Sequence, residues 1–174
     1  MPSTRSAVDM LAVLGLVLGA VFGMAGSFVA QPNLQALLWA IDSSGLVMAS
    51  TLLGCKYFRM GRDLVAAGFL VFGLGSAVML SGTAAGPAAS MPAFAAGTAL
   101  WSVGLLLVSI PSGFVFLVRI VGLASAILFA VVAVRIFLGE PLLPTAAPLP
   151  FFAYPVLVLT FLGWIWSVLR ESEG

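Results

Sequence analysis

The sequence predicts an all-α membrane protein, a polytopic bundle of six transmembrane helices with both termini cytoplasmic. Three observations predict this fold. First, the chain has 174 residues, of which 62% are hydrophobic and only 7% charged, whereas soluble domains carry about 25% charged residues. Second, the mean hydropathy is +1.22. Third, six separate windows each reach the length of about 20 mostly apolar residues that a helix needs to cross a bilayer.

The six windows form a single transmembrane domain that covers residues 1–174. Each window ends at residues that interrupt an apolar helix, such as Gln31-Pro32-Asn33 after the first and Pro111-Ser112-Gly113 after the fourth. A proline-rich connection, residues 139–150, precedes the last window. The expected spans are residues 7–30, 34–55, 64–83, 93–110, 114–138 and 151–169.

The positions of the basic residues predict the orientation, because lysine and arginine are enriched on the cytoplasmic side of membrane proteins. With the N-terminus inside, only Arg135 falls on the outer side. The residues that fall inside or near the inner boundary are Arg5, Lys56, Arg59, Arg62, Arg119 and Arg170. We therefore expect a multi-pass protein of the cell membrane whose main partner is the lipid bilayer. Arginine outnumbers lysine six to one, which favours a bacterial origin and hence the bacterial inner membrane.

The first span has a second interpretation as a cleaved secretory signal. Arg5 supplies a short positive region, and Ala25-Gly26-Ser27 after the apolar stretch resembles a cleavage site. The apolar stretch is long for a signal, however, and its glycines are regularly spaced. We expect the span to be retained; cleavage would leave five spans in the same orientation.

The composition excludes most catalytic chemistry. The chain has no histidine and one cysteine, Cys55, so histidine metal sites, Ser–His or Cys–His nucleophile pairs and intrachain thiol redox pairs cannot form. No phosphate-binding loop of the GxxxxGK[ST] type is present. The net charge of +1 without a basic run argues against nucleic-acid binding. We therefore expect no enzymatic activity, no cofactor and no metal ion.

Glycines at regular spacing mark faces on which helices can approach closely. In lipid, contacts between small residues contribute strongly to helix association. The stripes are Gly15, Gly19 and Gly23 in the first span and Gly68, Gly75 and Gly82 in the third. Two interpretations stay open: packing within the bundle, which is common in polytopic proteins, and an interface with a second copy or with another membrane protein.

Asp42 is the most informative polar residue. At 1.5 Å per residue from Leu34, it lies on the order of 12 Å below the outer boundary, where an ionised carboxylate needs a partner or water. Ser43 follows it, and Trp39 shares its helix face. We expect an ion pair between Asp42 and Arg135 of the fifth span. The alternative is that Arg135 turns outward, toward Glu140.

Two functions remain open. The first is a non-enzymatic helix-packing or accessory module that acts through lateral contacts in the membrane. The second is a small transporter or ligand-binding membrane protein, with a polar site in the outer leaflet formed by Asp42, Arg135, Ser43 and Trp39. A pocket open to one side and lined by these residues favours the second function. A sealed Asp42 favours the first.

Overall fold

The protein is a bundle of six α-helices without strands, as a computed structural model shows for residues 7–83 and 89–171. All six helices are long and apolar enough to span a membrane. The predicted all-helical fold and the six apolar helices are thus confirmed. The helices are α1 (Ala7–Phe28), α2 (Pro32–Arg59), α3 (Asp63–Thr83), α4 (Met91–Ser109), α5 (Phe116–Phe137) and α6 (Ala153–Glu171).

Helix α2 is longer than the predicted span of residues 34–55 at both ends. It begins at Pro32, because a proline in the first turn loses no intrahelical hydrogen bond. It continues through Lys56 and Arg59, where positive charges interact favourably with the C-terminal end of the helix dipole. The chain turns back only at Gly61, whose φ of +69° favours a residue without a Cβ atom.

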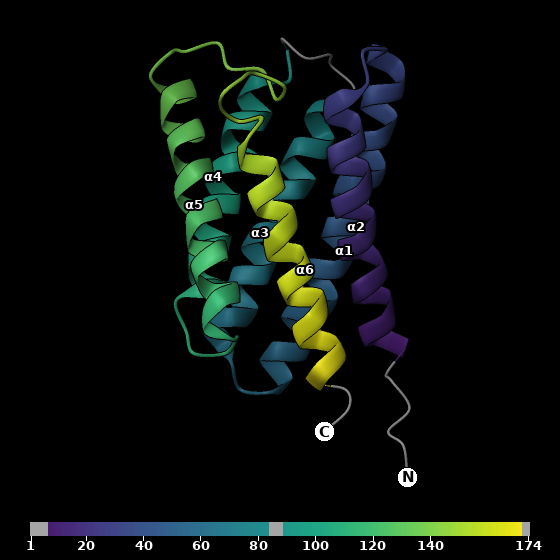
Figure 1. The fold of residues 1–174 in the computed structure, drawn as a ribbon, viewed down its shortest axis with the longest axis vertical. Coiled ribbons are helices and arrows are strands. Elements are labelled where there is room, and N and C mark those ends of the chain that lie inside the picture. The colour runs from purple at the N-terminus through teal and green to yellow at the C-terminus, as the bar shows by residue number, and fades with distance from the viewer. Residues whose placement is uncertain (1–6, 84–88, 172–174) are drawn as a thin grey trace.

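The helices form a closed ring. Each helix packs against its neighbours in the sequence, and α6 also packs against α1 (Figure 1). The start of α1 and the end of α6 lie at the same end of the bundle, which we call the terminal end. The opposite end carries the α1–α2 turn and the connection of residues 138–152, and we call it the loop end. Consecutive helices therefore run antiparallel.

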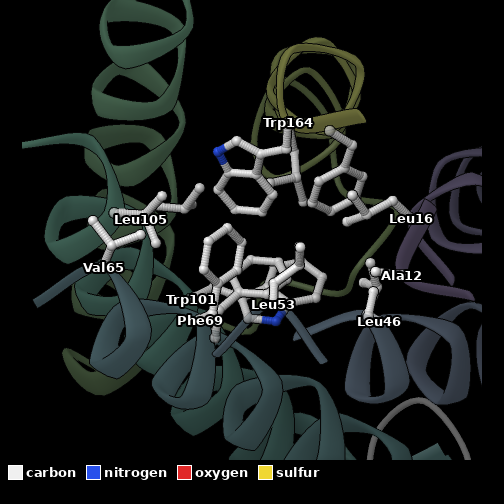
Figure 2. Packing of buried hydrophobic residues seen from close by; sticks show 14 of the residues in the cluster. Ala12, Leu16, Leu46, Leu53, Val65, Phe69, Trp101, Leu105 and Trp164 are labelled. Atoms are coloured by element: carbon white, nitrogen blue, oxygen red, sulfur yellow. The ribbon is translucent and has the colours of Figure 1, made fainter. Parts of the chain in front are cut away.

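Aromatic side chains fill the middle of the ring. Phe72 of α3 stacks on Trp101 of α4 with ring centroids 5.1 Å apart, and Phe129 of α5 meets the same indole edge-on at 5.3 Å. Trp164 of α6 packs against Phe69 at 4.8 Å (Figure 2). Such pairs contribute about 0.5–1.5 kcal/mol each beyond the area that they bury. The aromatic rings therefore hold α6 against helices that are distant in the sequence.

Four charged side chains join three helices at the terminal end. The Lys56 ammonium lies 3.0 Å from Asp9 of α1 and 3.2 Å from Glu171 of α6. The Arg62 guanidinium lies 3.4 Å from Glu171, and Tyr57 Oη donates to the same carboxylate at 3.4 Å. These contacts connect the start of α1, the end of α2 and the end of α6.

All six stripe glycines face another helix of the same chain. A Cβ atom at Gly68 would lie 2.9 Å from the Gly104 carbonyl oxygen of α4, and one at Gly75 would lie 2.8 Å from that of Gly97. At Gly82 it would meet Ala93 at 2.7 Å. The α1 stripe lies in the same way on α2, against Asp42, Gly45, Leu46 and Ala49. The structure therefore uses both stripes inside the bundle.

We predict that Gly68→Val destabilises the protein while Ala67→Val, its neighbour on the exposed face of α3, does not. The added side chain at position 68 would strike backbone atoms of α4, namely the Gly104 oxygen and the Val108 nitrogen, which cannot move aside without separating the two helices. We expect a loss of about 1–3 kcal/mol, the usual cost of overpacking. The measurement is thermal unfolding in detergent micelles. Equal melting temperatures of the two variants would contradict the prediction.

Candidate functional site

A cavity of about 370 Å³ lies inside the ring toward the loop end. Its walls come from α1, α2, α3, α4 and α6 and from Pro144 in the connection before α6, whereas α5 contributes no lining residue. Pro32 and Asn33 at the start of α2 belong to the lining and are exposed. The cavity therefore reaches the surface of the bundle at its loop end.

Asp42 forms part of the cavity wall. It lies in the third turn of α2 and is 8% exposed. Its carboxylate packs against the glycine face of α1: a Cβ atom at Gly23 would lie 3.2 Å from Asp42 Oδ1, and one at Gly19 would lie 3.3 Å from the same oxygen. The acidic side chain therefore lies close against α1, where a Cβ atom at either position would make a tight contact with it.

The Asp42 carboxylate has no protein partner within residues 7–83 and 89–171. It forms no ion pair and accepts no hydrogen bond there, and no lysine or arginine of those residues lines the cavity. Lys56 and Arg62 are held at the terminal end by Glu171. Arg119 donates to the Ser109 and Ile110 carbonyl oxygens at the end of α4.

The predicted ion pair between Asp42 and Arg135 is not formed. Arg135 instead pairs with Glu140, with Nη2 2.6 Å and Nε 2.8 Å from the carboxylate oxygen Oε2. Helix α5 ends at Phe137, and Gly139 with a φ of +95° reverses the chain so that Glu140 meets Arg135. Helices α2 and α5 do not pack against each other. The Arg135 side chain therefore reaches Glu140, whereas Asp42 lies on a helix that does not contact α5.

Three of the four predicted polar-site residues share the cavity. Ser43, 4% exposed, and Trp39, one turn before Asp42, both line it with Asp42. The indole of Trp39 also lies against Gly26 of α1. The fourth residue, Arg135, lies outside the cavity. The site is therefore a single carboxylate with neighbouring polar groups, and not an ion pair.

Sequence reasoning missed the aromatic wall of the cavity. Phe94 and Trp101 of α4 and Tyr154 and Phe161 of α6 complete the lining. Trp101 Nε1 donates to Ser76 Oγ at 2.9 Å, which fixes the plane of its ring. One signal was present for Trp101, because it shares a helix face with Gly97 and Gly104. No comparable signal marks the residues of α6, since their direction depends on how α6 closes the ring.

The geometry suits binding. Ligand sites are mostly apolar concave surfaces with a few placed polar groups, and this cavity combines aromatic walls with one carboxylate and several hydrogen-bonding side chains. The described part of the chain contains no group of three or more histidine, cysteine, aspartate or glutamate residues that could hold a metal ion. The chemistry that the site offers is therefore one carboxyl group in an apolar, aromatic surround.

Comparisons with models of protein families, with curated proteins and with solved structures found no match to this chain.

We predict that a thiol placed in the cavity wall is accessible to solutes. In a Cys55→Ser background, which removes the exposed native thiol, Ser43→Cys should react with the small neutral reagent methyl methanethiosulfonate. Ser125→Cys is the matched control, because Ser125 is fully buried and bonded to Thr160 between α5 and α6. The measurement is the rate of modification by mass spectrometry of the folded protein. Equal protection of both thiols would show that the cavity is closed.

Proposed function

We propose that the protein is a multi-pass protein of the bacterial inner membrane with both termini in the cytoplasm. The support is the distribution of charge along the bundle. Lys56, Arg59 and Arg62 lie at the terminal end, and Arg119 and Arg170 lie near the ends of α5 and α6 on that side. Of the basic residues that the structure describes, Arg135 alone lies near the loop end. Under the positive-inside rule, the cavity then opens on the side away from the cytoplasm.

Reporter fusions test this topology. Green fluorescent protein fused after Gly174 should fluoresce, because it folds in the cytoplasm. Alkaline phosphatase inserted after the exposed Thr145 in the α5–α6 connection should be active, because it needs the oxidising outer compartment. An inactive phosphatase at position 145 together with a dark C-terminal fusion would contradict this topology and indicate the opposite orientation.

We further propose that the protein binds a small molecule in the cavity, as a ligand-binding membrane protein or a small transporter. One observation carries this proposal: a buried carboxylate without a protein partner, Asp42, lies in the wall of a cavity that reaches the surface. A structural clasp would require a partner for that charge, and residues 7–83 and 89–171 supply none. An ionised group in hydrocarbon must face water, a ligand or an opposite charge.

The size of the cavity supports the same function. Its volume of about 370 Å³ falls at the lower end of the range of roughly 300–1,000 Å³ that is typical of ligand pockets. The other function, an accessory module, was based in part on the glycine stripes as an interface with other membrane proteins. Because both stripes face helices of the same chain, we favour ligand binding.

Purification of the full chain in mild detergent tests ligand binding. We predict that wild-type protein retains a small molecule detectable by mass spectrometry and that Ser43→Phe, which fills the cavity, loses it. Ser44→Phe is the matched control, because Ser44 is the next residue on α2 and faces outward. It should retain the molecule at the wild-type level. Equal retention by both variants, or none by the wild type, would contradict binding in this cavity.

A further inference from the structure

The lining of the cavity indicates which class of ligand it takes. We propose that the ligand is a monovalent organic cation with an apolar or aromatic body, bound with its charged group at Asp42. This inference rests on the proposed function and adds the charge and shape of the ligand to it.

The site holds one carboxyl group, which carries a negative charge when it is ionised. Asp42 is the one acidic residue in the lining, and the described lining contains no lysine or arginine. Elsewhere, Asp9, Glu140 and Glu171 each pair with a basic side chain. A ligand with a positive charge would give Asp42 the partner that it lacks, whereas an anion would meet an unopposed negative charge. Charge complementarity therefore selects a cation.

The surface around the charge is aromatic and apolar. Trp39 lies one turn from Asp42 on the same helix, and Phe94, Trp101 and Phe161 also line the cavity. The faces of aromatic rings attract organic cations, and such contacts are strongest where water is excluded. An ammonium group with hydrocarbon substituents can therefore be bound by the carboxylate and the rings together.

The number of carboxylates argues against a divalent metal ion. Calcium takes six to eight oxygen ligands and magnesium requires octahedral coordination. The cavity offers one carboxylate, and no second acidic residue lies in its described lining. One carboxylate balances one positive charge. A monovalent ion that brings its own apolar surface fits this lining better than a small, strongly hydrated ion.

A matched pair of probes tests the inference. The cation is benzyldimethyl(2-hydroxyethyl)ammonium, and its neutral carbon isostere is 3,3-dimethyl-4-phenylbutan-1-ol, which has the same shape without the charge. Both are titrated by calorimetry into the purified full chain in micelles, with titrations into empty micelles subtracted. We expect wild-type protein to bind the cation at least about tenfold more tightly than the alcohol, which corresponds to about 1.4 kcal/mol.

Substitution of Asp42 assigns the preference to its charge. In Asp42→Asn the ratio of the two affinities should fall to about one, since the shape of the wall is kept and the charge is removed. Asp63→Asn is the matched control: Asp63 is an exposed acid at the start of α3, outside the cavity. It should keep the wild-type ratio.

The outcomes separate this inference from the proposed function. Wild-type protein that binds the alcohol as tightly as the cation, or that binds no cation, overturns the inference even if Asp42→Asn does not fold. A preference that persists in folded Asp42→Asn also overturns it. In each case the retention experiment with Ser43→Phe and Ser44→Phe still decides whether the cavity binds a ligand at all.

Discussion

The close approach of helix backbones at glycine is the constraint on which the rest of the structure depends. Where α1 meets α2 and α3 meets α4, a side chain at the stripe positions would strike the neighbouring helix. Two tightly packed helix pairs follow, and they are brought together by α2 against α3. Helices α5 and α6 then complete the ring, with Gly122 of α5 against Ser109 of α4 and Gly163 of α6 against Val118 of α5. Small residues thus determine which helices can be neighbours, and aromatic residues fill the interior that this arrangement leaves.

The charged side chains near each end of the bundle form ion pairs with one another. At the terminal end, Lys56, Arg62, Asp9 and Glu171 satisfy one another. At the loop end, Arg135 and Glu140 satisfy each other locally. Asp42 lies between these two sets and belongs to neither. A buried carboxylate is costly to ionise without a partner. The position of Asp42 therefore supports the proposed site, in which a ligand pairs with its carboxylate.

Hydropathy alone predicted the fold class and the six helices, because spans of about 20 apolar residues between interrupting residues are a strong signal. It placed the end of α2 too early, since Lys56 and Arg59 interrupt the apolar run but not the helix. A helix terminus tolerates positive charges well. The shared position of Asp42, Ser43 and Trp39 in the cavity wall was also predictable, because it follows from their order along one helix.

The partner of Arg135 and the aromatic wall were not predictable in the same way. The contact with Glu140 depends on a chain reversal at Gly139, which hydropathy does not describe. The inward direction of Tyr154 and Phe161 depends on where α6 packs. In both cases the decisive information is tertiary geometry.

The contact between Gly23 and Asp42 has a consequence for how the chain can change in evolution. The two residues form no bond, yet a Cβ atom at position 23 would lie 3.2 Å from Asp42 Oδ1, a tight contact that the carboxylate would have to relieve by moving. A larger side chain at position 23 would displace the carboxylate further. Positions 23 and 42 should therefore covary among related sequences. Sequences with aspartate at position 42 should have a small residue at position 23, and larger residues at position 23 should occur together with a different residue at position 42.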